Sequence, residues 1–210
     1  MHFESAKSTS VVACDQNPIM TPDIALNLLW VVWVASWLAA AFWSDRAAGR
    51  PGFASELFYR IVTILGAILL FGTRRFDHAA VPLWRSGEAV GWTLFAVAAL
   101  GFAFCWWARI HLGRLWSGFV TRKAGYRIID TGPYGVVRHP IYTGIILAVF
   151  ATAAFKGTGV ALFGAAVMTG GFWIKARLEE RFLRQELGTA AYDSYRRRVP
   201  MLVPFGPKAA

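Results

Sequence analysis

Five apolar runs divide this chain, and their lengths limit what it can fold into. Ile24–Trp43, Leu57–Gly72 and Ala89–Ile110 approach or reach the roughly 20 residues that a membrane-spanning helix needs. Ile141–Phe155 and Val160–Ile174 are shorter and lie close together, so we expect them to form a helical hairpin. Hydrophobic residues make up 56% of the chain and the mean hydropathy is +0.44, which is too apolar for an ordinary soluble domain. The sequence therefore predicts an all-α, polytopic integral membrane protein with about five transmembrane helices.

The basic residues flank the apolar runs, which indicates how the chain is oriented. Lysine and arginine number 22 against 12 acidic residues, giving a formal net charge of +10. At the ends of apolar runs such an excess suits anionic lipid headgroups, and we expect no nucleic-acid partner. The connection from Arg109 to His139 and the tail beyond Ile174 are both basic, so we expect both in the cytoplasm and the N-terminus outside. This topology leaves the loop Arg74–Arg85 outside despite its three arginines.

The chain is expected to form one membrane domain. Its polar N-terminal arm lacks the apolar core of a cleavable signal peptide. Cys14 and Cys105 are far apart and suggest no disulfide framework, and no His or Cys spacing predicts a metal site. The expected segments are an N-terminal arm (1–22), three transmembrane helices (23–110), a cytosolic loop (111–140), a transmembrane helical hairpin (141–174), and cytosolic C-terminal helices with a tail (175–210).

A turn followed by a helix start, within Thr131–Gly144, is the first candidate site. Pro140 suits the first position of a helix, because the N–H that it lacks would have no partner there. His139 precedes a proline and is expected to be extended, and free backbone N–H groups at a helix start attract anions. Together with Arg138 and Tyr142, this start suggests a site for a small polar molecule. The alternative is a plain loop between two membrane helices, with a stop-transfer arginine.

The second candidate is the acidic pair Glu179 and Glu180, which follows the last apolar run. Carboxylates at the membrane edge are costly unless they are paired or face a cavity, so they are functional candidates. The alternative is that they pair along their own helix with Arg177, Arg181 or Arg184.

Three motifs follow one another in the C-terminal part of the chain. GPYGVVRHPIYTG at Gly132–Gly144 is followed by EERFL at Glu179–Leu183 and by YDSYRRRVPMLVP at Tyr192–Pro204. In this order and spacing the motifs resemble the isoprenylcysteine carboxyl methyltransferase family. That family belongs to a wider group of integral-membrane methyltransferases, which also holds phospholipid N-methyltransferases. The segments before Gly132 resemble the family only as apolar spans.

The resemblance implies S-adenosylmethionine as the cofactor, bound without a Rossmann domain in a pocket open to the cytosol. The methionyl carboxylate would suit the helix start at Pro140, helped by Arg138 or His139, and the amino group or ribose hydroxyls would suit Glu179 or Glu180. The residues that match the family's cofactor motifs are Tyr134, Arg138, His139, Pro140, Tyr142 and Gly144, then Glu179 and Glu180, then Tyr192, Tyr195, Arg196, Arg197, Val199 and Pro200.

The resemblance also implies methyl transfer to a lipophilic acceptor that stays dissolved in the lipid bilayer. The first expectation is the carboxylate of a prenylated cysteine, with a lipid amine or a small thiol as alternatives. Lys175, Arg177 and Arg109 are candidate cations to hold a carboxylate, and the sequence does not choose among them. Glu180 is a candidate to accept a proton from an amine. Outside this class, the alternatives are a sterol-type membrane reductase that uses NADPH and a non-catalytic membrane protein.

Overall fold

A computed structural model describes residues 20–42, 53–72, 82–113 and 128–208. Within these ranges the chain is helical, and the only extended pairing is an isolated bridge between Pro82 and Thr158. Most of the expected N-terminal arm, and residues 114–127 of the expected cytosolic loop, lie outside the described residues. The helices are α1 (Pro22–Ala41), α2 (Phe53–Phe71), α4 (Glu88–Leu112), α5 (Pro133–Val136), α6 (Pro140–Lys156), α7 (Gly159–Leu187) and α8 (Thr189–Arg198).

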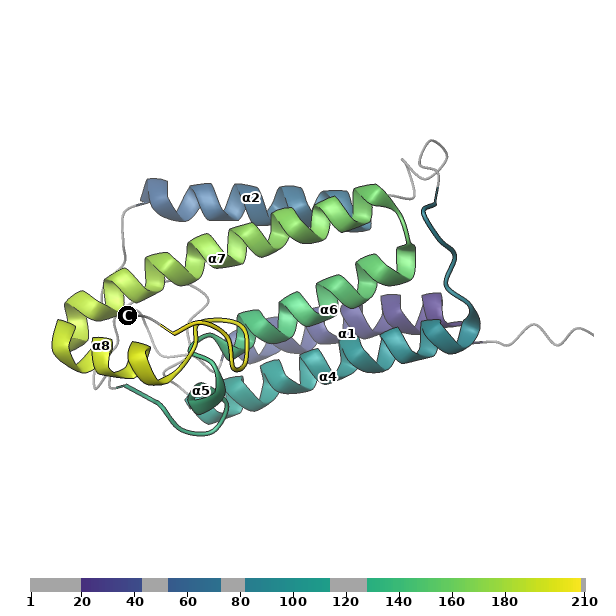
Figure 1. Cartoon of the computed structure of the whole chain (residues 1–210). Helices are drawn as coiled ribbons and strands as arrows, with labels where there is room; N and C mark the ends of the chain where they lie inside the picture. Colours follow the sequence, from purple (N-terminus) through teal and green to yellow (C-terminus); the bar gives the residue numbers. More distant parts are fainter. Residues whose placement is uncertain (1–19, 43–52, 73–81, 114–127, 209–210) are drawn as a thin grey trace, which may run out of the picture.

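The long helices form a bundle with the short ones gathered at one end (Figure 1). α2 packs along α7, while α4 packs against both α6 and α1. α6 and α7 are joined by a tight turn at the far end of the bundle. At the other end lie α5, α8, the start of α6 and the last part of α7. This arrangement brings the C-terminal motifs to the same end of the molecule.

The prediction of an all-α membrane protein is confirmed. Within the described residues, α1, α4 and α7 are long and apolar enough to cross a membrane, and α6 is a shorter apolar helix of 17 residues. The total of five spans and the sides on which the termini lie stay predictions. The two apolar runs expected as a hairpin become α6 and the first part of α7, and α7 then continues unbroken to Leu187.

Local sequence explains where these helices begin. Thr21 caps α1, because its side chain accepts a hydrogen bond from the backbone N–H of Ile24, and Pro22 follows at the first helical position. α6 begins at Pro140 as predicted. It ends at Gly157, whose φ of +63° lies in the left-handed region that glycine adopts without strain. Thr158 then caps α7 by accepting from the N–H of Ala161.

Small residues bring two pairs of helices into backbone contact. A Cβ atom on Gly101 of α4 would lie 2.5 Å from the carbonyl oxygen of Gly144 on α6. A Cβ atom on Gly66 of α2 would lie 2.5 Å from the backbone nitrogen of Met168, and one on Gly164 of α7 would lie 2.7 Å from that of Leu70. Since only glycine fits at such distances, these positions fix the spacing within the pairs α4–α6 and α2–α7.

Aromatic side chains join α1 to these pairs. The ring of Trp30 packs edge-on against Phe71 of α2 and Phe102 of α4, with centroid distances of 5.0 and 4.8 Å. Its indole N–H donates to Thr152 Oγ1 of α6 at 2.9 Å, so this buried polar atom is satisfied. Trp33 stacks on Phe102 at 4.6 Å. The tryptophans in the middle of the first apolar run therefore pack inside the bundle.

Candidate functional site

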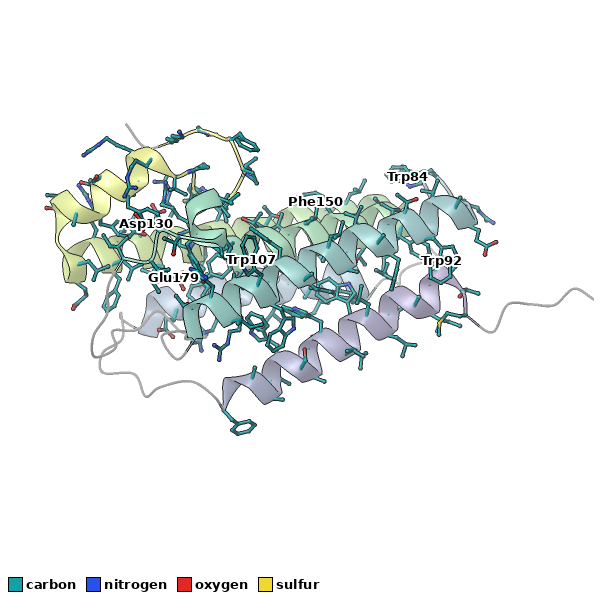
Figure 2. The ribbon with its side chains drawn as sticks, turned by 90° about the horizontal axis from the view of Figure 1, so that it is seen from below. Trp84, Trp92, Trp107, Asp130, Phe150 and Glu179 are labelled. Atoms are coloured by element: carbon teal, nitrogen blue, oxygen red, sulfur yellow. The ribbon has the colours of Figure 1, made fainter. Side chains whose placement is uncertain are left out.

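The start of α6 and the last part of α7 meet at the end of the bundle that holds α5 and α8. The hydroxyl of Tyr142 donates to Glu179 Oε1 at 2.6 Å. Nε of Arg138 lies 2.6 Å from Oε1 of Glu180, in an ion pair whose side chains are 4% and 5% exposed. Figure 2 shows Glu179 and Asp130 at this end of the molecule and Trp84 and Trp92 at the opposite end. Two motifs about forty positions apart in the chain thus form one polar cluster in a largely apolar bundle.

The side chain of Arg138 connects three segments of the chain: the start of α6, α7, and the end of α8 with the residue after it. Besides its ion pair with Glu180, its guanidinium donates to the backbone carbonyls of Arg196, at 3.1 Å, and of Val199. Arg196 in turn places its Nε 3.3 Å from Glu180 Oε2. The carboxylate of Glu180 is therefore shared by two guanidinium groups and ties α7 to α8 and to the start of α6.

His139 lies between the two carboxylates. Its Nδ1 is 3.4 Å from Glu179 Oε2 and its Nε2 is 3.4 Å from Glu180 Oε1. Its ring stacks on Tyr142 with centroids 5.4 Å apart and planes 5° from parallel. Burial alone would favour the neutral ring, but hydrogen bonding and attraction by both carboxylates outweigh it and raise the pKa of His139. The charged form of His139 is therefore favoured by its neighbours.

The C-terminal segment is fastened to the start of α6. The backbone N–H groups of Arg138 and His139 donate to the carbonyls of Pro200 and Met201 at 2.9 and 3.1 Å. The hydroxyl of Thr143 donates to the carbonyl of Leu202 at 2.6 Å. The closing motif is thus held directly over the first one.

α8 packs on this end through its tyrosines. Tyr192 and Tyr195 are buried with Val199, and burial raises the pKa of both phenols well above the usual range. The hydroxyl of Tyr195 donates to the carbonyl of Tyr134 at 2.7 Å and so joins α8 to α5. Arg197, by contrast, is exposed.

The three candidate cations have different surroundings. The ammonium of Lys175 lies 5.2 Å from the ring centre of Tyr142 and 5.6 Å from that of Tyr59 on α2. Arg177 is exposed, and its guanidinium lies 5.1 Å from the ring centre of Trp173 on its own helix. Arg109 is fully buried and donates to the backbone carbonyls of Gly113 and Ala40, which ties the end of α4 to α1. The structure brings only Lys175 next to the cluster of glutamates.

Three residues of the first motif contribute packing. Pro140 is buried at the start of α6, and Gly144 provides the contact with Gly101 on α4. The ring of Tyr134 lies 6.3 Å from that of His111 on α4. These positions support the site through the helices that carry it.

Comparison with known proteins shows which family this end of the molecule resembles. Residues 93–185 match the model of the isoprenylcysteine carboxyl methyltransferase family. Over these residues the chain resembles that family. The matched region includes α6 and the two glutamates of α7, and therefore both halves of the polar cluster.

Three similar proteins carry the names of methyltransferases. Methanethiol S-methyltransferase 2 of Bradyrhizobium diazoefficiens is 34% identical over 156 residues, which are 70% of this chain and 58% of that protein. Methanethiol S-methyltransferase of a Pseudomonas species is 42% identical over 187 residues, 89% of this chain and 58% of that protein. Protein-S-isoprenylcysteine O-methyltransferase B of Arabidopsis thaliana is 29% identical over 87 residues, 41% of this chain and 44% of that protein. The chain thus spans less than two thirds of the length of each of them.

Sequence reasoning missed polar residues that α2 adds beside this polar cluster. Glu56 and Tyr59 are buried near Lys175, and Arg60 pairs with Glu56 at 2.5 Å. The signal was available, because these three polar residues lie on one helical face beside an apolar run.

Proposed function

We propose that this protein is an integral-membrane, S-adenosylmethionine-dependent methyltransferase. The observation that carries the proposal is the meeting of the family's first two motifs through Tyr142–Glu179 and Arg138–Glu180. Since each motif alone has a plain structural explanation, their convergence around buried charges is what favours a binding site.

The residues present fit such a cofactor. S-adenosylmethionine carries an ammonium, a carboxylate and ribose hydroxyls, and the cluster contains groups of both signs. Glu179 is the more accessible acid, with 18% of its side chain exposed against 5% for Glu180. Within the described residues, Nε2 of His139 and Nε of Arg196 are buried, and their contacts with Glu180, at 3.4 and 3.3 Å, are long for hydrogen bonds. We therefore assign Glu179 to the ammonium or ribose, and His139 and Arg196 to the carboxylate.

The cofactor, when bound, supplies a methyl group on a positively charged sulfur. The chain's own contribution is placement and exclusion of water, which can lower a barrier by roughly 7–11 kcal/mol when the reactants are well oriented. Arg138 keeps the start of α6, α7 and the closing segment together, and so acts as a positioning residue. Tyr142 keeps Glu179 in place through its 2.6 Å hydrogen bond.

We propose a small thiol as the acceptor, in preference to the carboxylate of a prenylated cysteine. Two of the relatives are named methanethiol S-methyltransferases, and they match more of this chain than the relative named for isoprenylcysteine. A thiol in the bilayer, or entering from it, would reach the polar cluster at the end of the apolar helices. We further propose that this end faces the cytoplasm, as the basic segments around it indicate.

Ligand-dependent stabilisation of the purified protein in detergent tests the cofactor. S-adenosylhomocysteine at a hundred times its dissociation constant should raise the free energy of unfolding by about 2.7 kcal/mol, whereas NADPH should have no effect. The variants His139→Ala and Glu179→Gln should lose the stabilisation, while Glu186→Gln, an exposed position on the same helix, should keep it. Stabilisation by NADPH alone would favour a reductase and would contradict the proposal.

Methyl transfer to three acceptors tests the substrate class. Protein in lipid vesicles is given radiolabelled cofactor with methanethiol, a farnesylated cysteine analogue or phosphatidylethanolamine. We expect labelled thioether from the thiol. Transfer to the farnesylated analogue alone would contradict the thiol proposal and would identify the carboxylate of a prenylated cysteine as the acceptor.

A further inference from the structure

A second polar group lies next to the cofactor candidates, on the face that α2 presents to α7. Glu56 and Tyr59 are 5% and 4% exposed, in a helix that is otherwise largely apolar. The ammonium of Lys175 lies between the rings of Tyr59 and Tyr142, and the charged groups that act on it are Glu179, Arg60 and Glu56. This group therefore adjoins Glu179 through Lys175 and Tyr142.

Two buried polar atoms of this group make no well-formed hydrogen bond within the described part of the chain. They are Oε1 of Glu56 and the hydroxyl of Tyr59, although the nearby guanidinium of Arg60 also acts on Tyr59. The other carboxylate oxygen of Glu56 accepts from Arg60 at 2.5 Å. A buried polar atom left without a hydrogen bond costs about 1–3 kcal/mol, so two such atoms beside a site point to a ligand.

The adjoining layer of the α2–α7 contact is closed. Thr63 lies one turn beyond Tyr59 on α2, and Gly171 lies one turn before Lys175 on α7. A Cβ atom on Gly171 would overlap Thr63 Oγ1 and lie 3.0 Å from its backbone nitrogen. Beyond that layer, Gly66 and Gly164 keep the two backbones in contact. A long hydrocarbon chain therefore has no room between α2 and α7 on this side of the polar group.

We propose that Glu56 and Tyr59 of α2, together with Lys175 of α7, form the acceptor subsite and bind a small thiol through its S–H group. This inference rests on the proposed methyltransferase function and adds α2 to the site. The thiol proton is donated to Oε1 of Glu56, and the sulfur accepts a hydrogen bond from the hydroxyl of Tyr59. The ligand thus provides a partner for both atoms.

The same groups favour the sulfur anion when the proton leaves. The proton passes from sulfur to Oε1 of Glu56, which then releases it to water, and the electron pair of the S–H bond stays on sulfur. The resulting thiolate lies close to the ammonium of Lys175, which stabilises it. Glu56 is the general base in this step and touches the acceptor, so it is a catalytic residue; Tyr59 and Lys175 orient the sulfur.

The subsite discriminates against an ionised carboxylate. A carboxylate has no proton to donate to Glu56, so its arrival would leave Oε1 without a partner and would place two like charges together. A lipid amine can donate a proton, but the closed layer at Gly171 and Thr63 excludes its tails from this side. A small group that carries its own proton satisfies both conditions.

Binding of ethanethiol without any methyl donor tests the subsite. Saturation-transfer NMR measures contact between the protein in detergent micelles and ethanethiol, with empty micelles as the blank. Glu56→Gln and Tyr59→Phe should each reduce the transferred signal at least fivefold. The matched control is Glu88→Gln, the same change in the first turn of α4, at the opposite end of the bundle. It should bind ethanethiol as the unaltered protein does.

A parallel measurement separates this inference from the proposed function. Stabilisation by S-adenosylhomocysteine should be unchanged in Glu56→Gln, Tyr59→Phe and Glu88→Gln, and it also reports that each variant is folded. In transfer assays, both α2 variants should raise the KM for methanethiol at least tenfold. In Glu56→Gln, kcat should also fall, and the pH profile of kcat should no longer show the ionisation of a basic group. Wild-type ethanethiol contact in both α2 variants, with stabilisation intact, would overturn the subsite alone; failure of S-adenosylhomocysteine to stabilise the unaltered protein would overturn the methyltransferase.

Discussion

The two halves of α7 pack by different means, one through close backbone contact and the other through buried charged residues. In the half near Thr158, Gly164 and Gly171 bring the backbone of α2 so close that no side chain fits between the helices. In the half that ends at Leu187, charged residues gather α6, α8 and the closing segment around Glu179 and Glu180. The first half sets the spacing of helices, and the second holds loops and helix ends together at a site.

The difference shows how a membrane bundle can keep a polar site rigid. The hydrophobic effect gives little reason for helices to associate within lipid, so close packing of small residues must fix them. Buried ion pairs are costly to desolvate and add little net stability, but they place charged groups in defined positions. Substitutions in the two halves should therefore have different effects on the stability of the protein and on ligand binding.

A substitution in the charged half of α7 should cause the largest loss of stability. Glu180→Ala leaves the guanidinium groups of Arg138 and Arg196 without their shared carboxylate, and removing one partner of a buried pair costs about 3–5 kcal/mol. Thermal unfolding in detergent should show a much lower midpoint and no stabilisation by S-adenosylhomocysteine. Glu186→Ala, at an exposed position of the same helix, is the control. Equal midpoints for the two variants would mean that the buried charges do not organise this end.

The apolar half should give a smaller effect that depends on position. Gly164→Ala forces a Cβ atom toward the backbone nitrogen of Leu70, and overpacking of this kind costs about 1–3 kcal/mol. Nothing lies within 4 Å of a Cβ atom on Gly170. Gly170→Ala should therefore be neutral or stabilise the helix by up to about 1 kcal/mol. Unfolding midpoints of the two variants measure the contrast, and a loss at Gly170 as large as that at Gly164 would contradict it.

A pH series examines the charged half more finely through His139. Its pKa is raised in the folded protein, because the carboxylates of Glu179 and Glu180 outweigh burial. Its contribution is therefore fully present below the unfolded pKa of about 6.5 and is lost as the pH rises through the higher folded pKa. The difference in unfolding midpoint between the protein and His139→Gln should be greatest at acidic pH and should shrink toward alkaline pH.

The carboxylates themselves provide the control for that series. In a Glu179→Gln background, the pH dependence of the His139→Gln effect should be much weaker, because one of the two charges that raise the pKa is gone. An unchanged pH dependence in that background would assign the effect to another group.

Helical spacing predicted part of this site, and tertiary contacts decided the rest. The start of α6 at Pro140 could be predicted from local sequence, because a proline at the first helical position is a local signal. Lys175 and Glu179 are four residues apart and share a face, whereas Arg177, two residues on, does not; helical phase could have separated these two cations. The buried setting of Glu56 and Tyr59 depends on which helix pairs with α2, and the apolar run does not contain that information.

Arg138 shows a different limit of the sequence. The motif indicated a cation beside a helix start, which suggested a partner for a ligand's carboxylate. The guanidinium is instead used by Glu180 and by the carbonyls of Arg196 and Val199. Those carbonyls come from a segment some sixty positions away, so only the fold reveals that the charge is already engaged.

The smallest expected effect concerns how α8 is attached to α7. Arg184 donates to both carboxylate oxygens of Asp193 at 2.8 and 2.6 Å, and this hydrogen bonding lowers the pKa of Asp193. Asp193 also accepts from Arg196 at 3.1 Å, and the side chains of Arg184 and Asp193 are 46% and 22% exposed. Water and salt screen ion pairs at such a surface, so Asp193→Asn should hardly change the unfolding midpoint at neutral pH. Any difference should vanish as the pH falls through the folded pKa of Asp193, which lies below the unfolded value of about 3.9.

Tyr195→Phe gives the comparison that makes the Asp193 result informative. It removes the hydrogen bond to the carbonyl of Tyr134, in partly buried surroundings, and should cost about 1 kcal/mol. Unfolding midpoints at low and high salt rank the two variants. A larger loss for Asp193→Asn than for Tyr195→Phe would show that exposed charge, and not the buried face of Tyr192 and Tyr195, holds α8 over the site.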